Sequence, residues 1–340
     1  MNTEYAPAAT GARARRLHPP AVGRETVTAA GGAMAHGGDY DVVVVGGGPA
    51  GLSGALWLAR YRRRVRVFDA GDPRNAATWA VHGYPGIQDP PPQELRRTLM
   101  LQAVDAGAEY EPACVQAVEG EEDRFTVTLE DGRTFGARRL LFCTGLRDIV
   151  PEIPGLQRFY GGSIWHCPDC DGPSVPGKRL GVIGWGRGIV NFCLYMLTWT
   201  DRMTVLTHGR EPEMDSKERA ALDRFAIPVR TEAIERLEGN EATQQVERVV
   251  FQGGEPLEVD AMFFHIAVGP GSALPAALGC AADRDGLLQI ESDFATTVPG
   301  VYAAGDITPG ARLTVRAAYE GVRAAIAIHK SLIPDDRRVG

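Results

Sequence analysis

The sequence predicts an α/β protein with two three-layer nucleotide-binding domains, the second of which is inserted into the first. Residues 41–60 and residues 179–199 each join an aliphatic run to a glycine-rich turn and a helical stretch, which predicts two similar domains. Residues 301–328 return to the strand-then-helix pattern of the first unit, which predicts the insertion. A strand, a glycine-rich turn and a helix begin the βαβ unit of a Rossmann-like domain.

The length and composition agree with two globular domains and exclude several classes of protein. The chain has 340 residues, a net charge of −7 and six cysteines. It has no apolar run of the ~18–20 residues that a membrane span needs. An acidic chain without a long basic stripe is a poor candidate for binding nucleic acid or a membrane. Six cysteines are too few for a disulfide-stapled secreted scaffold, so we expect a cytoplasmic protein. Residues 1–38 are rich in Ala, Gly, Pro and Arg and are expected to be disordered.

The first unit carries a dinucleotide fingerprint. A strand at residues 41–45 leads directly into the glycine turn, and a helix is expected over residues 52–61. Glycine lets the backbone turn tightly and approach a pyrophosphate, whose charge then lies at the helix N-terminus. Asp69 ends the next strand, residues 65–69, where a carboxylate can hold ribose hydroxyls. The expected dinucleotide-binding residues are Gly46, Gly48, Pro49, Ala50, Gly51 and Asp69.

Between the first unit and the cysteine pair, the pattern predicts a helix, a hairpin and a further buried strand. An amphipathic helix is expected near residues 93–106. A β-hairpin is expected over residues 125–135, with Asp131-Gly132 at its turn. A separate buried strand is expected at residues 139–143, and Thr144-Gly145 ends it.

Two cysteines lie three positions apart in the segment His166-Cys167-Pro168-Asp169-Cys170-Asp171, which is expected to be a loop. This spacing allows a small disulfide and lowers the pKa of one thiol, so that a thiolate is available for exchange. His166 or Asp171 could move a proton to or from a sulfur, and Asp171 is preferred. A pair of inert thiols remains an alternative, as does a zinc half-site, although no second CxxC or HxxxH completes the four ligands that structural zinc needs. The other cysteines are expected to be buried and unreactive: Cys114, Cys143, Cys193 and Cys280.

The second glycine turn departs from the fingerprint. Gly184, Gly186 and Gly188 are present, but the third fingerprint position holds Ile189. A bulky side chain there should push the following helix away or reshape the pocket, because a small residue normally packs between helix and strand at this place. The next strand ends at His208-Gly209-Arg210, whose cations suit the 2′-phosphate of NADPH. A degenerate domain that no longer binds nicotinamide is the alternative.

The remaining elements complete the second domain and then the first. Helical composition covers residues 190–199, and strands are expected at residues 179–183, 203–207, 246–252 and 261–268. A short strand at residues 301–304 ends at Gly305-Asp306, and a helix is expected over residues 314–328.

Together these residues resemble the low-molecular-weight thioredoxin reductases, which are FAD-dependent pyridine nucleotide-disulfide oxidoreductases. The similarity extends from about residue 40 to residue 332 and rests on five segments: 46–51, 143–145, 167–172, 184–188 and 300–306. The resemblance implies a discontinuous FAD-binding domain at residues 39–149 and 272–332. It also implies an NAD(P)-binding-like insert at residues 150–271 that carries the cysteine pair, and a homodimer.

The resemblance also implies roles for individual residues. Gly46–Gly51 would lie at the FAD pyrophosphate, Asp69 at the adenosine ribose and Asp306 near the ribityl chain. Further FAD positions would be Asn75, Thr144, Gly145 and Gly305, and the NADPH positions would be Gly184, Gly186, Gly188, His208 and Arg210. Cys170 would face the flavin, Cys167 would exchange with the substrate, and Asp171 would donate and accept protons.

Departures from the family pattern leave the electron donor open. Typical members have a small residue in place of Ile189, two adjacent arginines after the histidine at position 208, and an Arg-Gln pair in place of Arg312-Leu313. Residues 69–75, together with His82, resemble a divergent branch that includes gliotoxin- and holomycin-type dithiol oxidases. Those enzymes oxidise small-molecule dithiols and pass the electrons to oxygen. Other divergent relatives take electrons from ferredoxin.

The sequence therefore predicts an FAD-dependent thiol–disulfide oxidoreductase that acts through Cys167 and Cys170. NADPH is the expected donor, and a thioredoxin-like protein is the expected acceptor. The alternatives are a dithiol oxidase for a small molecule and a reductase that uses ferredoxin. A non-enzymatic redox sensor is a further alternative, against which Asp171 argues, because proton transfer beside Cys170 is a requirement of turnover. No metal site is expected.

Overall fold

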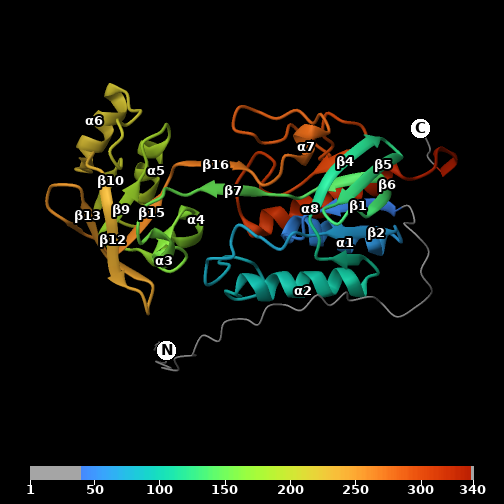
Figure 1. Ribbon diagram of the computed structural model, residues 1–340, viewed down its shortest axis with the longest axis horizontal. Coiled ribbons are helices and arrows are strands. Elements are labelled where there is room, and N and C mark those ends of the chain that lie inside the picture. Colours follow the sequence, from blue (N-terminus) through green and yellow to red (C-terminus); the bar gives the residue numbers. More distant parts are fainter. Residues whose placement is uncertain (1–39, 338–340) are drawn as a thin grey trace, which may run out of the picture.

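The computed structural model describes residues 40–337, which form two lobes joined by a narrow ribbon (Figure 1). One lobe contains a seven-stranded sheet and the other a five-stranded sheet. The ribbon consists of β7 (Leu146–Ile149) and β16 (Ala267–Pro270), which pair in antiparallel fashion next to the two predicted domain junctions. The predicted α/β fold with two Rossmann-like domains is confirmed. The disorder predicted for residues 1–38 lies outside the described residues.

The first lobe is built around parallel strands that run through its centre. The sheet has the order β3-β2-β1-β6-β5-β4, and β17 pairs with β6. Its strands are β1 (Tyr40–Val45), β2 (Val65–Phe68), β3 (Glu109–Glu111), β4 (Val115–Glu121), β5 (Arg124–Leu129), β6 (Thr134–Phe142) and β17 (Val301–Ala303). Its helices are α1 (Pro49–Arg60), α2 (Pro92–Asp105), α7 (Leu274–Ala277) and α8 (Thr314–Ser331).

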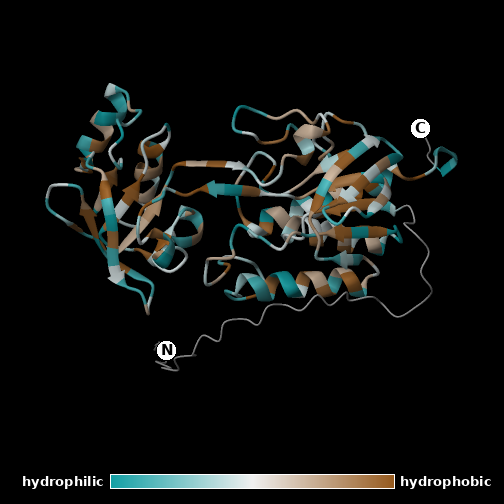
Figure 2. Ribbon diagram, in the orientation of Figure 1, coloured by the Kyte–Doolittle hydropathy of each residue, from teal (hydrophilic) through white to brown (hydrophobic). Residues whose placement is uncertain are grey.

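Burial explains why the first unit forms as the sequence predicts. Residues 42–45 of β1 are all buried, because the parallel sheet is covered on both faces. Helix α1 packs closely on α8, where a Cβ atom on Gly321 would lie 2.0 Å from the carbonyl oxygen of Ala50. Figure 2 shows hydrophilic and hydrophobic residues alternating along α2, and its buried residues recur every three to four positions.

The inserted lobe repeats the arrangement on a smaller scale. Its parallel sheet has the order β11-β10-β9-β15-β8, and a three-stranded sheet has the order β12-β13-β14. The strands are β8 (Ile164–Trp165), β9 (Leu180–Ile183), β10 (Met203–Leu206), β11 (Val229–Arg230), β12 (Ile234–Asn240), β13 (Gln245–Phe251), β14 (Leu257–Glu258) and β15 (Ala261–Phe264). The helices are α3 (Leu156–Phe159), α4 (Pro168–Asp171), α5 (Ile189–Met196) and α6 (Ser216–Arg224), and a short 3₁₀ turn covers Gly172–Ser174. A second 3₁₀ turn, Asp335–Arg337, follows α8 in the first lobe. Within residues 40–337, every helix is too short or too polar to cross a bilayer.

Two strand predictions were wrong. The hairpin arm and the separate strand predicted up to residue 143 are one strand, β6. Its first half pairs antiparallel with β5, and its second half pairs parallel with β1, so one strand serves both partners. The strand predicted at residues 261–268 is instead two, because the chain leaves the parallel sheet after Phe264 and joins the ribbon at Ala267.

Smaller differences concern the cysteines and the helix ends. The predicted loop around the cysteine pair contains the short helix α4, which Pro168 begins. Cys114 is half-buried, whereas Cys143, Cys193 and Cys280 are buried as predicted. Helix α5 ends at Met196 and not at residue 199. Ile189 is buried at the start of α5.

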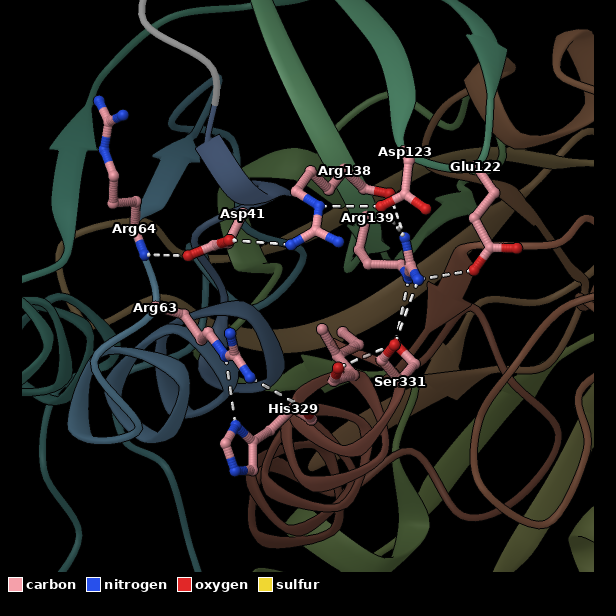
Figure 3. Close-up of polar contacts among 10 residues, drawn as sticks. Asp41, Arg63, Arg64, Glu122, Asp123, Arg138, Arg139, His329 and Ser331 are labelled. Carbon is pink, nitrogen blue, oxygen red and sulfur yellow. Dashed lines mark hydrogen bonds and ion pairs between the residues drawn. The ribbon is translucent and has the colours of Figure 1, made fainter. Parts of the chain in front are cut away.

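A buried arginine ties three segments of the first lobe together, on the side of the sheet where β1 begins (Figure 3). The Arg139 side chain on β6 is 5% exposed and forms ion pairs with Glu122 and Asp123, which lie at the turn between β4 and β5. Its Nε also donates to the Ser331 hydroxyl at 3.0 Å, where α8 ends. The guanidinium thus supplies the hydrogen bonds that water would otherwise give to the polar groups at the β4–β5 turn and at the end of α8.

Arg139→Met is expected to lower the free energy of unfolding by about 1–3 kcal/mol, because buried hydrogen bonds to charged and carbonyl groups are lost. Urea unfolding followed by circular dichroism measures this change. Arg138→Met is the matched control, since the Arg138 side chain is 43% exposed. The control should change stability by no more than about 0.5 kcal/mol. Equal losses in the two variants would contradict the role given to Arg139.

Candidate functional site

One cavity between the lobes brings together most of the residues that the sequence analysis selected. Its wall contains Gly46, Gly48, Pro49, Ala50, Asp69, Asn75, Thr144, Gly145, Gly305 and Asp306 from the first lobe and its junction with the ribbon. The inserted lobe contributes His166, Cys167 and Cys170 to the same wall. Gly51 and Asp171 are both buried and lie outside the wall. Gly184, Gly186, Gly188, His208 and Arg210 are not part of this cavity.

The first glycine turn is closed on the protein side and open on the cavity side. A Cβ atom on Gly51 would lie 1.9 Å from the carbonyl oxygen of Gly46, so only glycine fits where α1 crosses the turn. Gly46 has φ +108, a conformation that favours glycine. A Cβ atom on Gly48, by contrast, would meet nothing within 4 Å. Because Gly48 also caps the N-terminus of α1, the free N–H groups of that helix lie at the edge of an open space that suits a phosphate.

Asp69 is held in place by two residues that sequence reasoning missed. Its carboxylate accepts hydrogen bonds from the Tyr110 hydroxyl at 2.9 Å and the Gly71 N–H at 3.1 Å, and it pairs with Arg96. Burial alone would raise the pKa of Asp69, but the Arg96 guanidinium and the hydrogen bonds from Gly71 and Tyr110 together lower that pKa. Arg96 also lines the cavity and donates to the carbonyl of Gly47. The position of Arg96 on the amphipathic helix α2 gave no signal of this contact.

An unpaired hydroxyl and a fixed turn complete the part of the cavity that suits a dinucleotide. The Thr144 Oγ1 atom is buried and has no hydrogen-bond partner among residues 40–337. At the end of β17, the strand beside β6, the Gly305 N–H donates to the buried Glu320 carboxylate at 2.8 Å, which fixes the turn that carries Asp306. A buried polar atom without a partner is rare in a folded protein. The open glycine turn and this hydroxyl therefore fit a ligand such as FAD.

The two cysteines form a disulfide at the start of α4. Cys167 is the N-cap residue, and its Sγ accepts a hydrogen bond from the Cys170 N–H at 3.2 Å. An N–H group directed at a sulfur stabilises negative charge on it. When the disulfide opens, the Cys167 thiolate therefore already has a donor. Both cysteines are half-buried, so the disulfide is open to the cavity.

The pKa values of the two candidate proton carriers, Asp171 and His166, shift in opposite directions. Burial raises the pKa of Asp171 to about 6, and His82 offsets part of that rise. Burial lowers the pKa of His166 to about 4, although Asp148 acts in the opposite direction. Near neutral pH, His166 is therefore uncharged, whereas Asp171 titrates close to the working range of a proton carrier. This favours Asp171 over His166, as the sequence analysis preferred.

A chain of polar contacts connects the first lobe to His166 through the ribbon. Arg74 pairs with Asp148 on β7 and lies 3.3 Å from the Asp306 carboxylate. The Tyr160 hydroxyl lies 3.5 Å from the Asp148 carboxylate and 3.0 Å from Nδ1 of His166. Sequence reasoning missed Asp148 and Tyr160, because a single carboxylate and a single tyrosine carry no motif. This series of polar contacts orients the ring of His166, the residue that precedes Cys167.

His208 and Arg210, the two residues predicted to bind the 2′-phosphate of NADPH, both contact other residues of the inserted lobe. Nδ1 of His208 accepts a hydrogen bond from the Ile234 N–H at 3.0 Å, and burial lowers the pKa of His208. His208 is therefore neutral near pH 7 and offers no charge to a 2′-phosphate. The Arg210 guanidinium lies 4.3 Å above the ring of Trp185, a residue of the second glycine turn.

Comparisons with known proteins agree with this architecture. The family model described as pyridine nucleotide-disulphide oxidoreductase matches residues 40–321. Thioredoxin reductase tcpT of Claviceps purpurea is 32% identical over 278 residues, which cover 78% of this chain and 86% of tcpT. The crystal structure of HlmI is similar with a TM-score of 0.82 and 34% identity, and the similarity covers 88% of this chain and 95% of HlmI. The putative thioredoxin reductase TrxB of Bacillus anthracis gives a TM-score of 0.79 at 27% identity, covering 86% of this chain and 98% of TrxB.

Proposed function

Because the chain belongs to the pyridine nucleotide-disulphide oxidoreductase family and is thioredoxin reductase-like, we propose that it is an FAD-dependent thiol–disulfide oxidoreductase working through Cys167 and Cys170. One observation carries the proposal: the disulfide and the open glycine turn belong to a single cavity. A redox-active disulfide has to meet its electron partner directly, and this arrangement allows it. The family uses FAD and pyridine nucleotides.

The first lobe would hold FAD through its backbone and a few side chains. The pyrophosphate would lie beside Gly48, at the N-terminus of α1, and the ribose hydroxyls beside Asp69. The free Thr144 hydroxyl and the Asp306 carboxylate would serve the remainder of the molecule. Bound FAD would supply reversible two-electron chemistry at the edge of the disulfide.

The cysteine pair would exchange electrons with a thiol substrate in two steps. Asp171 takes the proton of a substrate thiol, and the resulting thiolate attacks Sγ of Cys167 to form a mixed disulfide. The Cys167–Cys170 bond breaks, and Asp171 returns the proton to the released Cys170 sulfur. A second substrate thiolate then attacks the mixed disulfide and leaves as the oxidised product. The Cys170 N–H stabilises the Cys167 thiolate that remains. Two substrate thiols thus lose two electrons, and the enzyme disulfide gains them.

Two directions of turnover share this site. In the reductive direction, NADPH is the donor and a thioredoxin-like protein the acceptor. The succession of a strand, a glycine turn and a helix at β9 and α5 favours this direction. In the oxidative direction, a small dithiol is the donor and dioxygen the acceptor, which leaves as hydrogen peroxide. The resemblance of residues 69–75 and His82 to dithiol oxidases favours this second direction. Ferredoxin as donor, the homodimer and the cytoplasmic location remain predictions from the sequence.

An anaerobic titration of the FAD-loaded protein tests the proposal. We expect dithiothreitol to remove the visible flavin absorbance, because a dithiol can reduce the Cys167–Cys170 disulfide and, through it, the flavin. A parallel titration with NADPH separates the two directions. If neither dithiothreitol nor reduced thioredoxin changes the flavin spectrum of the intact protein, the proposal is wrong.

Turnover is expected to increase with pH around a midpoint near 6, the pKa of Asp171. Below that pH Asp171 is protonated and cannot take a proton from the incoming thiol. Asp171→Asn should remove this limb of the profile and lower the rate by about 10²–10⁴-fold. Initial rates of dithiol oxidation between pH 5 and 9 measure both effects. Asp169→Asn is the control, because Asp169 is exposed. A limb that survives in the Asp171 variant would assign the titration to another group.

A further inference from the structure

Ile189 and His265 of the inserted lobe crowd both ends of the second glycine turn, residues 184–188. A Cβ atom on Gly184 would lie 2.5 Å from Cδ1 of Ile189 and 2.6 Å from the carbonyl oxygen of His265. A Cβ atom on Gly188 would lie 3.1 Å from Nε2 of His265. His265 directly follows β15, the strand beside β9, and its imidazole therefore faces the turn from the neighbouring strand.

The helix after the second turn also begins later than its counterpart. In the first lobe, Gly48 is the N-cap, so the third fingerprint residue, Gly51, already lies in the first turn of α1. In the inserted lobe the equivalent of Gly48 is Gly186, but the N-cap is Gly188, and Ile189 opens the helix. The free N–H groups that would bind a pyrophosphate are therefore displaced by two residues along the chain.

His265 covers this displaced helix end. Its ring stacks on Phe192 in the first turn of α5, with 5.1 Å between ring centroids. Burial, followed by the nearby Arg312, lowers the pKa of His265, so its ring is neutral near pH 7 and adds no charge for a phosphate. Gly186 itself remains open, with nothing within 4 Å of a Cβ atom. The middle of the turn, at Gly186, thus stays accessible to a ligand. The His265 ring, however, occupies the N-terminal end of α5, where an anion would bind.

We infer that His265, together with Ile189, excludes pyridine dinucleotides from the inserted lobe, so that the lobe carries the disulfide but does not take up NADPH. The inference deepens the proposed function and rests on it in one respect. If the Cys167–Cys170 pair exchanges electrons with FAD, the electrons enter from a dithiol, whose two thiols become a disulfide as the enzyme disulfide becomes two thiols. His265 is then a determinant of donor specificity and not a catalytic residue.

Isothermal titration of the FAD-loaded protein with NADPH tests the inference without any turnover. The wild type should give no saturable heat up to about 1 mM NADPH. His265→Ala should bind NADPH at least about tenfold more tightly than the wild type, and His265→Ala combined with Ile189→Ala should bind it more tightly again. His329→Ala is the matched control, since His329 also stacks on an aromatic ring, that of Tyr61, in the other lobe. The control should behave as the wild type does.

Two results would overturn the inference. One is a wild-type dissociation constant for NADPH below about 100 μM. The other is the absence of binding in both His265 variants when they retain FAD and a native circular dichroism spectrum, since the exclusion would then have another cause. The single variant leaves the buried Ile189 in place, so it tests the role of His265 even if the double variant fails to fold. Because binding heat needs no redox step, failure of the proposed function appears separately, in the dithiol titration.

Discussion

Cys170→Ser is expected to lower turnover with every thiol substrate by about 10³-fold or more, the scale seen when a member of a concerted catalytic group is removed. Without Cys170 the enzyme disulfide cannot form, so Cys167 can still make a mixed disulfide but has no partner that passes two electrons onward. The glycine turn and the other FAD-facing positions are unchanged, so the variant should stay yellow. Steady-state rates and the flavin-to-protein ratio measure the two effects.

Cys280→Ser is the matched control for this substitution. Sγ of Cys280 lies 3.5 Å from the Thr296 hydroxyl, so serine can keep the same hydrogen bond in a buried position away from the disulfide. The turnover of Cys280→Ser should equal that of the wild type within about twofold, since residue 280 contacts neither the Cys167–Cys170 disulfide nor the proposed FAD positions. Full activity of Cys170→Ser with any dithiol would overturn the disulfide mechanism for that substrate.

Gly51→Ala and Gly48→Ala are expected to separate the folding of the first turn from its ligand binding. At Gly51 a methyl group would lie 1.9 Å from the Gly46 carbonyl, so the turn must open and the apo protein should lose about 1–3 kcal/mol of stability. At Gly48 the backbone has φ −78, and a methyl group meets nothing within 4 Å. The apo stability of Gly48→Ala should therefore change by no more than about 0.5 kcal/mol.

Both variants should nevertheless bind FAD more weakly. The methyl group of Gly48→Ala would fill the space that the pyrophosphate is proposed to take, which should raise the dissociation constant about 10- to 100-fold. Thermal melting of the apo forms and a fluorescence titration with FAD give the two quantities. If Gly48→Ala binds FAD as the wild type does, the pyrophosphate does not lie at this turn. If Gly51→Ala melts as the wild type does, the crowding seen in the structure does not limit folding.

The two-domain fold was predictable because its signals are local. A buried run at residues 42–45 followed by Gly46–Gly51 dictates strand, turn and helix within a few residues, and the cysteine spacing is equally local. The continuity of β6 was not predictable, because Gly136 and Ala137 look like a break in the sequence. Both residues are held in a strand by pairing with β5, and Ala137 also pairs with Tyr40 of β1, which lies much earlier in the chain.

The missed site residues share the same physical reason. Arg96, Asp148 and Tyr160 have no motif around them, and their importance arises from tertiary contacts between separate elements. His265 is a similar case, since it simply follows a buried strand in the sequence. Ile189 did give a signal, because a fingerprint specifies the residue expected there, and a departure from a specified pattern can be seen without a structure.

Asp148 acts as a counter-ion that the two lobes share. It lies on the ribbon, with Arg74 of the first lobe on one side and the Tyr160 hydroxyl of the inserted lobe on the other. A rotation about the ribbon that carried the disulfide out of the cavity would have to stretch one of these contacts. Since the Asp148 side chain is only 7% exposed, dissolved salt screens the contacts weakly. The orientation of the lobes should therefore respond to the loss of that one charge, as in Asp148→Asn, far more than to ionic strength.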